Sequence, residues 1–241
     1  MKRSNILVII PCYNEEANIR TVVDRLIAKC PDVDYLVVND CSTDGSEAIL
    51  RENGYNHVTL PVNLGIGGGV QTGYRYAMEN GYQVAVQMDG DGQHDPAFLR
   101  TVTAPVEAGE LDMCIGSRFL EKEGFQSSAL RRFGIAFLSM LIFILSGKRV
   151  KDVTSGFRAT GPAMTAYFAA HYAADYPEPE AILAATLRGF SVGEAPVRME
   201  QRLGGISSIR SFKSAYYMIK VTLALLVDRI SIRRKKGGRN A

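Results

Sequence analysis

The residues best suited to chemistry are two aspartates separated by one glycine, Asp89-Gly90-Asp91, which directly follow a short apolar segment. Two carboxylates at this spacing can jointly hold a hard divalent cation, Mg²⁺ or Mn²⁺, which prefers oxygen ligands and can bridge the oxygens of a diphosphate. Gln93 and His94 are near enough in the sequence to act as further ligands. The alternative is an ordinary surface turn, because Asp-Gly pairs also favour turns.

Three other apolar segments are followed by polar residues or glycines in the same way. The stretches are PCYNEE at 11–16, NDCSTD at 39–44 and NLGIGGG at 63–69. Ligands of doubly wound α/β proteins bind at the carboxyl ends of the strands. Four such clusters together therefore predict one composite site, although any single cluster is common by chance.

Two familiar nucleotide-binding motifs are absent from the sequence. The dinucleotide fingerprint GxGxxG directly follows the first strand, and that position is occupied here by Pro-Cys-Tyr-Asn. A GxxxxGK[ST] phosphate loop is not found either. Both absences argue against a nicotinamide-dependent dehydrogenase and a P-loop ATPase.

The elements that must position these clusters are predicted from the hydrophobic pattern. Apolar runs at 6–10, 35–38, 84–86 and 113–115 are typical of strands buried on both faces, as in a mostly parallel sheet. Amphipathic stretches predict helices between them, at about 16–29, 44–53, 68–79 and 96–108. This order favours one doubly wound α/β domain flanked by helices. We expect it to span residues 1–208, with a helix and basic tail at 209–241.

The composition limits the classes of partner and compartment. The formal net charge of +3 is too small to indicate nucleic-acid binding, and we expect no nucleic-acid partner. Four scattered cysteines without metal-ligand spacing suggest a reducing compartment and no structural zinc. The longest apolar run, 135–145, is well below the roughly 20 residues of a membrane-spanning helix. With no secretion signal at its start, the chain is expected to be cytoplasmic and peripheral to the membrane face.

The C-terminal segment combines an apolar stripe with basic residues. Residues recurring at steps of three and four form the stripe: Ile209, Phe212, Tyr216, Ile219, Leu223, Leu226 and Ile230. Lys213 and Lys220 fall off the stripe, and a basic cluster follows from Arg229 to Arg239. This pattern predicts a helix lying on an anionic membrane. A coiled coil, a membrane-protein partner or packing on the parent domain are the alternatives.

Several arginines are placed where phosphate could bind. Arg118 follows a predicted strand end, and its guanidinium could hold phosphate oxygens in bidentate fashion. Arg202 precedes a glycine pair that could close over a bound donor. Arg131 and Arg132 open the apolar run 135–145, which suits the phosphate of a lipid. Surface ion pairs, and a core helix with a solvated first turn, are the corresponding structural alternatives.

Eight stretches of the chain resemble glycosyltransferase family 2 enzymes of the GT-A fold. Within that group they are similar to dolichyl- or polyprenyl-phosphate sugar transferases. The stretches are VIIPCYNEEANI, VVNDCSTDGS, NLGIGGGVQTGY, MDGDGQHDP, IGSRF, VTSGFRAT, GFSVGEAPV and RLGGISSI. They occur in the expected order over most of residues 6–209, and the combination is specific although each piece is short.

The resemblance implies a reaction and a role for each matching residue. The reaction is an inverting, metal-dependent transfer of a hexose from a UDP- or GDP-sugar to a polyprenyl phosphate. The donor nucleotide would be contacted by Pro11, Tyr13, Glu15, Asp40 and Asp89. The metal would be held by Asp89, Asp91 and Gln93. The phosphates would be bound by Arg118, Arg131 and Arg202, and the catalytic roles would belong to Asp91, Glu180 and Arg202.

Two positions depart from the family's pattern. The usual Asp-Asp-Gly-Ser after the second strand is Asn39-Asp40-Cys41-Ser42 here, which leaves the choice between uracil and guanine open. A lysine common after the Gly-x-Ser of the last stretch is replaced by Ser208, which removes one charge expected to face phosphate.

The resemblance also places Glu180 near the acceptor. The acidic residues Glu178 and Glu180 begin a predicted helix, where capping is a sufficient structural explanation. A phosphate acceptor has its second pKa near 6 and needs no strong general base, whereas a hydroxyl acceptor needs one. A transferase acting on a glycan hydroxyl, and a catalytically silent nucleotide-sugar binding protein, are the alternative functions.

Overall fold

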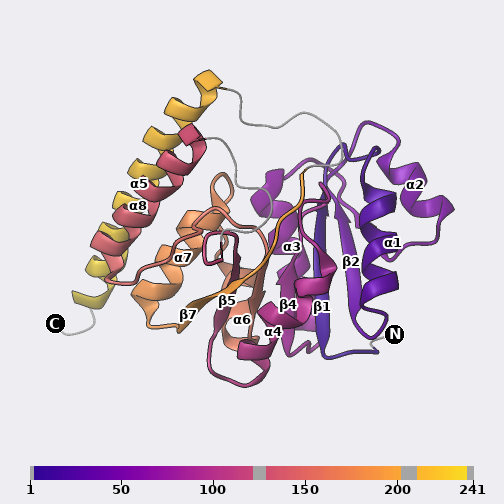
Figure 1. Cartoon of the computed structure of the whole chain (residues 1–241), viewed down its shortest axis with the longest axis horizontal. Helices are drawn as coiled ribbons and strands as arrows, with labels where there is room; N and C mark the ends of the chain where they lie inside the picture. The colour runs from indigo at the N-terminus through magenta and orange to yellow at the C-terminus, as the bar shows by residue number, and fades with distance from the viewer. Residues whose placement is uncertain (1–2, 122–128, 202–210, 238–241) are drawn as a thin grey trace.

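The computed structural model describes residues 3–121, 129–201 and 211–237. These residues form a seven-stranded sheet (Figure 1) in the order β3-β2-β1-β4-β6-β5-β7. The strands are β1 (Ile6–Cys12), β2 (Asp34–Asn39), β3 (His57–Thr59), β4 (Val84–Gln87), β5 (Met113–Ser117), β6 (Arg158–Thr160) and β7 (Val192–Pro196). Strand β6 runs antiparallel to its neighbours β4 and β5, and the other pairs are parallel. The prediction of a mostly parallel sheet is confirmed.

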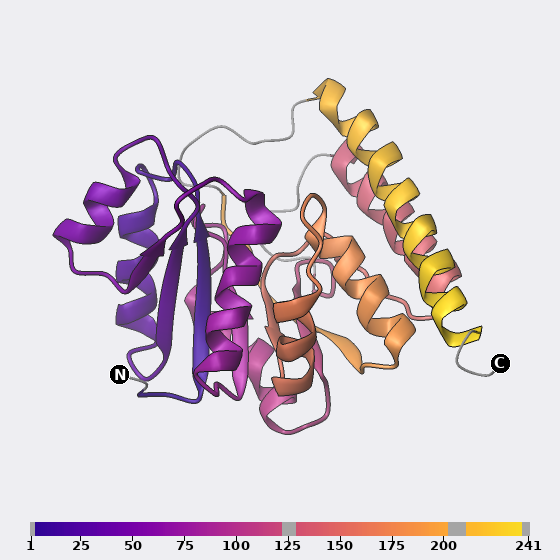
Figure 2. The ribbon, with the colours of Figure 1, turned by 180° about the vertical axis from the view of Figure 1, so that it is seen from behind.

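Helices cover both faces of the sheet (Figure 2). Two buried clusters divide the side chains of β1 between them, because alternate residues of a strand point to opposite faces: Ile6, Val8 and Ile10 join one, and Leu7 and Ile9 join the other. The first cluster includes residues of α1 (Ile19–Lys29), α2 (Ser46–Glu52) and α4 (Leu99–Glu107), which follows the 3₁₀ helix η1 (Pro96–Phe98). The second includes residues of α3 (Gly65–Glu79), α5 (Ala129–Ser146), α6 (Pro162–Ala170), α7 (Pro177–Arg188) and α8 (Ser211–Gly237). The doubly wound arrangement is therefore confirmed.

The four apolar runs at 6–10, 35–38, 84–86 and 113–115 are strands β1, β2, β4 and β5, and β3 is the segment before the cluster at 63–69, whereas β6 and β7 were not predicted. Strands β3 and β6 have three residues each, and neither is apolar at every position, unlike the runs at 84–86 and 113–115. Strand β6 also begins with Arg158, which is fully buried. Because arginine is charged, the sequence does not indicate that this strand lies inside the sheet, between β4 and β5. A charged residue is rarely buried in this way unless other groups compensate it.

Helices α5 and α8 lie side by side at one end of the molecule (Figures 1 and 2). In α8, Val221 and Leu225 are fully buried against the rest of the protein. The residues of the predicted stripe that the structure describes are instead exposed, by 39–62%: Tyr216, Ile219, Leu223, Leu226 and Ile230. Ile209 and the side chain of Phe212 lie outside the described residues. The helix is confirmed, and its apolar stripe faces outward while a different pair of residues packs on the domain.

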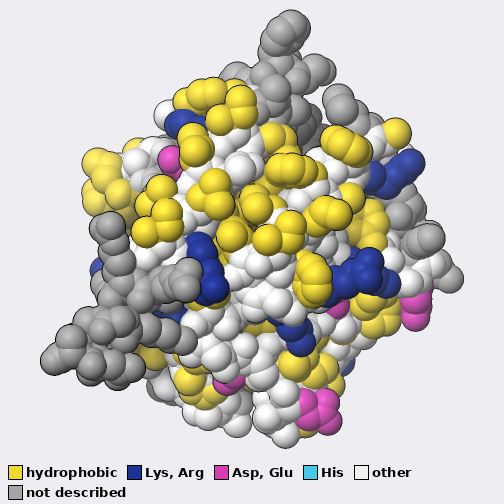
Figure 3. All heavy atoms as spheres, turned by 90° about the vertical axis from the view of Figure 1, so that its left-hand side faces the viewer, with side chains coloured by type: hydrophobic (Ala, Val, Ile, Leu, Met, Phe, Trp, Pro, Cys, Tyr) yellow, Lys and Arg dark blue, Asp and Glu magenta, His cyan; other side chains and the backbone are white. Residues whose placement is uncertain are grey.

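Helix α5 is divided in the same way. Its buried face carries Ile135, Leu138 and Ile142, whereas its outer face carries exposed Phe133, Phe137, Met140, Phe143 and Ile144. Figure 3 views this side of the molecule and shows hydrophobic side chains over much of it, with lysine and arginine side chains among them. We call the exposed apolar residues of α5 and α8 the outer apolar face. Within the described ranges, no helix is both long and apolar enough to span a membrane.

The orientation of α8 leads to a stability prediction. Leu225→Ala should lower the free energy of unfolding by about 2–5 kcal/mol, because it empties a fully buried position. Leu223→Ala, two residues away and 56% exposed, should change it by no more than about 0.5 kcal/mol. Urea denaturation of both variants measures the difference. The reverse order would mean that α8 packs through the predicted stripe.

Candidate functional site

The candidate site lies where β1, β2 and β4 end at one edge of the sheet. Cys12 at the end of β1 is paired with Asn39 at the end of β2, and Ile9 is paired with Gln87 at the end of β4. The three following loops are thereby brought to the same edge. They contain three of the four polar clusters that the sequence singles out, and the fourth, 63–69, includes the start of α3.

The loops after β1 and β2 are fastened to each other by hydrogen bonds. The backbone N–H of Asn14 donates to Ser42 Oγ at 3.0 Å, and Asn14 Oδ1 accepts from the Thr43 N–H at 2.8 Å. Glu16 Oε2 accepts from the Gly45 N–H at 2.7 Å. Asn14 and Cys41 adopt φ values of 54° and 58°, which are uncommon for residues other than glycine. Such conformations cost free energy and concentrate at functional sites.

The predicted donor-binding residues converge on these loops. Pro11 is buried at the end of β1, whereas Tyr13 is about half exposed. Glu15 accepts a hydrogen bond from Asn18 Nδ2 at 2.6 Å. Asp40 is almost fully buried, and its Oδ1 accepts from the Leu64 N–H at 2.7 Å. Asp40 thus holds the glycine-rich stretch that opens α3, a contact that sequence reasoning missed.

The DxD motif occupies a turn whose backbone requires glycine at two positions, Gly90 and Gly92. A Cβ on Gly90 would lie 2.8 Å from the carbonyl oxygen of Pro11, too close for any side chain. Gly92 has a φ of 79°, in the left-handed region that favours glycine. Asp91 Oδ1 accepts from the Gln93 N–H at 3.0 Å, which closes the turn. The close approach to Pro11 places the DxD turn beside the end of β1.

The carboxylate of Asp89 is surrounded by three groups. Gln87 Nε2 donates to its Oδ1 at 3.1 Å, and His94 Nε2 lies 3.8 Å from its Oδ2. A Cβ on Gly156 would lie 2.5 Å from Oδ2, so Gly156 leaves the space that the carboxylate occupies. His94 Nδ1 accepts from the Asp89 N–H at 3.0 Å, so the ring proton is on Nε2. Neither nitrogen then offers a lone pair to a metal, and the suggestion that His94 is a ligand is not supported.

The predicted metal ligands fit a divalent cation that is shared with a substrate. Within the described residues, no group of three or more His, Cys, Asp or Glu side chains is arranged as a metal site. Asp89 and Asp91 would supply two carboxylates, within the one or two that Mg²⁺ usually takes when substrate phosphates complete its coordination. The side-chain amide of Gln93 donates to the Glu200 carbonyl at 3.5 Å, a weak contact.

The segment that follows β7 is tied to the loop that carries the DxD motif. Glu200 donates its N–H to the Gln93 carbonyl at 2.9 Å, and Met199 forms an isolated bridge with His94. Arg25 of α1 holds the Glu200 carboxylate with two hydrogen bonds of 2.8 Å. Predicted residue Arg202 lies outside the described residues.

Arg118 has a protein partner that the sequence did not indicate. The side chain is buried, and its Nε and Nη2 donate to the two carboxylate oxygens of Asp152 at 2.7 and 2.9 Å. The backbone N–H groups of Lys151 and Asp152 in turn donate to Glu194 at 2.8 Å. A buried pair of this kind is costly to break, because either partner alone would be an uncompensated charge. Phosphate binding by Arg118 stays a prediction, and its observed role is to hold the 151–154 loop.

Arg131 is brought to the DxD end of the sheet. It begins the exposed part of α5, and the pKa of its guanidinium is lowered by burial and by the neighbouring Arg118 cation. Asp152 and Asp91 act on the same group in the opposite direction. Two arginines and the second DxD aspartate thus lie within electrostatic reach of one another.

The two acids in the first turn of α7 face different neighbours. The pKa of Glu178 is raised by burial and by Asp89, and Arg158 opposes this effect. The pKa of Glu180 is raised to about 7 by burial and then by Asp228, Asp175 and Glu178. The charge of Asp89 in the DxD motif therefore affects the pKa of Glu178, whereas the pKa of Glu180 is affected by Asp228 of α8. The proximity of Glu180 to an acceptor stays a prediction.

Sequence reasoning also missed the polar groups buried behind Asp89. Arg158 is fully buried and donates to the carbonyl oxygens of Ser155 at 2.5 Å and of Glu178 at 3.4 Å. Gln87 is fully buried at the end of β4. The available signals were a polar residue closing an apolar strand and the SGFR tetrapeptide at 155–158. Neither reveals its partners, because these come from distant parts of the chain.

The family profile described as Glycosyl transferase family 2 matches residues 7–170. This chain belongs to glycosyl transferase family 2. The chain is 31% identical over 228 residues to a polyprenol monophosphomannose synthase of Mycolicibacterium smegmatis, covering 89% of this chain and 84% of that one. It is 29% identical to a UDP-N-acetylglucosamine–dolichyl-phosphate N-acetylglucosaminyltransferase of Methanococcus voltae, covering 92% and 98%. The predicted family is confirmed, and the chain is a glycosyltransferase.

A solved structure confirms the fold of this glycosyltransferase. It is glucosyl-3-phosphoglycerate synthase from Mycobacterium tuberculosis, in complex with Mn²⁺, uridine diphosphate and phosphoglyceric acid. The TM-score is 0.71 at 21% identity, covering 94% of this chain and 78% of that one. At this identity the likeness establishes the GT-A fold predicted from the sequence.

The raised pKa of Glu180 predicts how the glycosyltransferase's stability depends on pH. The ordinary value of 4.5 is raised to about 7, so the folded state binds a proton that the unfolded chain releases. This contribution to stability is full below about pH 4.5 and is lost as the pH rises through about 7. Glu180→Gln should therefore lose less stability than the wild type between pH 5 and pH 8.

Urea denaturation at the two pH values measures this loss. Glu52→Gln, which changes an exposed glutamate at the end of α2, is the control and should follow the wild type. The assignment would be contradicted if Glu180→Gln lost as much stability between the two pH values as the wild type and Glu52→Gln do.

Proposed function

We propose that this glycosyltransferase transfers a hexose from a UDP- or GDP-sugar to a polyprenyl phosphate, with inversion at the anomeric carbon. The observation that carries the proposal is the position of Arg131. This residue stands at the start of an exposed apolar helix and within electrostatic reach of Asp91. A cation between an apolar surface and a metal-binding motif suits the phosphate of a lipid acceptor.

The donor nucleotide is assigned to the interlocked loops after β1 and β2. Pro11 lies near the end of β1, and Tyr13, Glu15 and Asp40 come from the loops. Tyr13 is exposed enough to stack on a base. Asp40 receives the Leu64 N–H on one oxygen, and its carboxylate is the hydrogen-bond acceptor we assign to the base or ribose. The M. tuberculosis structure, which contains uridine diphosphate, supports a nucleotide in this fold.

The diphosphate of the donor is assigned to the DxD turn. Asp89 and Asp91, with Gln93 beside them, would hold Mg²⁺ or Mn²⁺, and Mn²⁺ accompanies the nucleotide in the M. tuberculosis structure. Bound there, the cation would neutralise charge on the departing nucleoside diphosphate. Arg131, with Arg202, is assigned to the phosphate groups. Arg118 is assigned to the same region through its pair with Asp152, which orients the neighbouring loop.

The acceptor phosphate serves as its own nucleophile. One of its oxygens forms the new bond to the anomeric carbon as the bond from that carbon to the diphosphate oxygen breaks. A phosphate monoester has its second pKa near 6, so it is largely a dianion at neutral pH and no proton need be removed. The relatives in M. smegmatis and M. voltae, named for polyprenol- and dolichyl-phosphate products or acceptors, support this acceptor class.

A hydroxyl acceptor on a glycan is the second candidate function. It requires a general base with a pKa near the working pH, and the raised pKa of Glu180, about 7, is in that range. Against it, the largest influence on the pKa of Glu180 after burial is Asp228 of α8 rather than a residue of the DxD turn. The lipid phosphate therefore remains the proposed acceptor.

We assign the outer apolar face to the surface of an anionic membrane. Helix α5 contains no acidic residue and carries Arg131 and Arg132 in its first turn. Helix α8 has a single acid, Asp228, among its basic residues. Apolar residues flanked by cations are what an interfacial helix needs, and each basic residue near anionic lipid contributes about 1 kcal/mol. The face would bring a membrane-embedded acceptor to Arg131.

The proposed reaction is tested with a panel of donors. The protein is incubated with Mn²⁺, dolichyl or undecaprenyl phosphate and a set of UDP- and GDP-hexoses, and the lipid product is identified by mass. Asp91→Asn should lower the rate about a hundredfold or more, because loss of a charged ligand costs several kcal/mol of transition-state stabilisation. Asp32→Asn, which changes an exposed acid on the surface, should retain wild-type activity.

Two results would contradict the proposal. One is a product formed only on a glycan hydroxyl, with no glycosylated lipid from any donor. The other is wild-type turnover by Asp91→Asn at saturating Mn²⁺, which would remove the metal role of the DxD turn.

Membrane binding is tested by sedimentation with phosphatidylglycerol vesicles. Wild-type protein should sediment with them and be released by high salt, which screens the basic residues. The double variant Ile219→Ser/Leu223→Ser should lower the affinity for the vesicles by about tenfold or more, because both exposed side chains are removed from the apolar contact. Both residues are exposed, so the fold is preserved, whereas truncation of α8 would also remove buried Val221 and Leu225.

Ile27→Ser is the matched control, because Ile27 is 42% exposed on α1 at the far side of the molecule (Figure 1). It should sediment like the wild type. Equal sedimentation of all three proteins would exclude the outer apolar face from membrane binding. Absence of wild-type binding would point to a membrane protein as the partner of this face.

A further inference from the structure

We infer that Gln87 and Tyr172 are positioning residues that orient the Asp89 carboxylate for the metal. This inference rests on the proposed metal role of the DxD turn and goes beyond it to two residues outside the motif. The hydroxyl of Tyr172 donates to Gln87 Oε1 at 3.0 Å, and Gln87 Nε2 donates to Asp89 Oδ1 at 3.1 Å. The two hydrogen bonds form a chain that ends on the carboxylate.

The direction of the chain is fixed by chemistry. A carboxylate only accepts hydrogen bonds, so the Gln87 amide must turn its NH₂ group toward Asp89 and its oxygen toward Tyr172. Burial raises the pKa of Tyr172 well above its ordinary value, so the phenol keeps its proton and remains a donor. Tyr172 therefore prevents the amide from rotating, and the amide holds one oxygen of Asp89.

Gln87 occupies a position where the sheet alone would favour an apolar side chain. It closes the apolar strand β4 and is fully buried. A buried amide without partners costs a few kcal/mol, and here both of its ends are used. Because one of those partners is a predicted metal ligand, the arrangement is typical of the outer groups that orient metal-binding residues.

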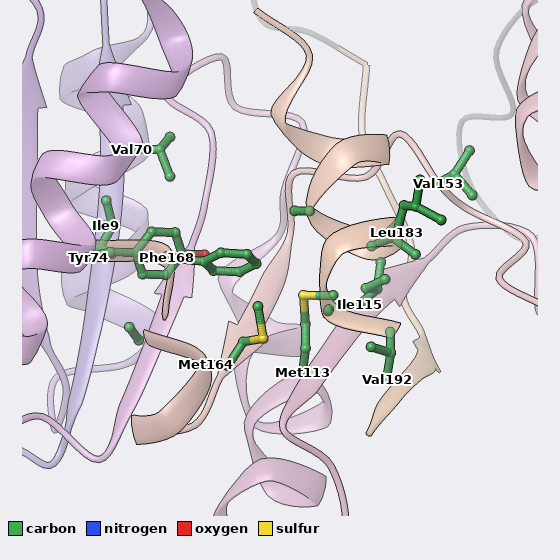
Figure 4. Packing of buried hydrophobic residues seen from close by; sticks show 14 of the residues in the cluster. Ile9, Val70, Tyr74, Met113, Ile115, Val153, Met164, Phe168, Leu183 and Val192 are labelled. Carbon is green, nitrogen blue, oxygen red and sulfur yellow. The ribbon is translucent and has the colours of Figure 1, made fainter. Parts of the chain in front are cut away.

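Tyr172 is itself held rigidly by its surroundings. Its ring centroid lies 5.4 Å from that of Tyr74 on α3 and 5.0 Å from that of Phe168 on α6. Figure 4 shows Tyr74 and Phe168 side by side. Two residues later, the Ala174 carbonyl accepts from the Gly67 N–H at 3.2 Å. The connector between α6 and α7 is thus fixed on both sides of the hydroxyl that starts the chain.

Mn²⁺ affinity in the presence of UDP, and separately of GDP, tests the inference by calorimetry. Tyr172→Phe keeps the ring and removes only the hydroxyl, and it should weaken Mn²⁺ binding about tenfold. Gln87→Leu should weaken it about 10- to 100-fold, the range seen when groups behind metal ligands are removed. The double variant should bind no more weakly than Gln87→Leu, because Tyr172 acts through Gln87.

Tyr167→Phe is the matched control. Tyr167 belongs to the same aromatic cluster, with its ring centroid 5.9 Å from that of Phe168, and its variant should bind Mn²⁺ within twofold of the wild type. Thermal midpoints verify that each variant is folded. In activity assays, excess Mn²⁺ should restore the turnover of Tyr172→Phe, which a purely structural defect would not allow.

The outcomes separate this inference from the proposed function. If the wild type binds Mn²⁺ and Tyr172→Phe binds it equally well, the positioning role is overturned and the metal site stands. An additive loss in the double variant, or an equal loss in Tyr167→Phe, would also overturn it. If the wild type binds no Mn²⁺ with either nucleotide, the metal site itself fails, and the positioning role fails with it.

Discussion

Burial of β1 between two parallel neighbours is the constraint on which the site depends. All seven residues of the strand are buried, and its side chains divide between the two cores of the protein. Pairing with β2 and β4 aligns the ends of three strands, so the loops after them must share one edge. The close packing of Gly90 against the Pro11 carbonyl then sets the DxD turn against the end of β1. A chemical site thus follows from the burial of apolar side chains elsewhere.

The polar groups behind this edge are arranged so that buried charge is compensated. Arg118 is paired with Asp152, while Arg158 lies near Glu178 and offsets the effects of burial and of Asp89 on that acid. Taking such groups out of water is costly unless partners replace the lost hydration. The result is a site whose carboxylates and cations are held in place before any substrate arrives.

The outer apolar face is a second surface of the molecule, and it is apolar where the candidate site is charged and polar. Its helices use one set of residues, including Val221 and Leu225, to pack on the domain, and another to face outward. Arg131 belongs to the first turns of α5 and senses both Arg118 and Asp91. The proposed acceptor site and the proposed membrane surface therefore meet at one residue. Tyr176 next to α7 packs edge-on against Tyr217 of α8, which joins α8 to the connector that carries Tyr172.

The sequence by itself determined the fold class, the family and the edge of the sheet where the clusters gather. Continuous apolar runs identify strands buried on both faces, and the loops after them can be read directly because strand and loop are adjacent in the chain. The position of the DxD motif after β4 was predictable for the same reason. Local patterns, in other words, fix what depends on neighbouring residues.

Only the tertiary structure decided the partners of the buried polar groups and the rotation of the outer helices. Tyr172 and Gln87 are 85 residues apart, and Arg118 and Asp152 are 34 apart, so no local pattern links them. A helical period identified the stripe on α8, but the helix also carries apolar residues between those positions. Which set is buried depends on the surface it meets, since hydrophobic burial is not directional and the shape of α5 and α7 selects Val221 and Leu225.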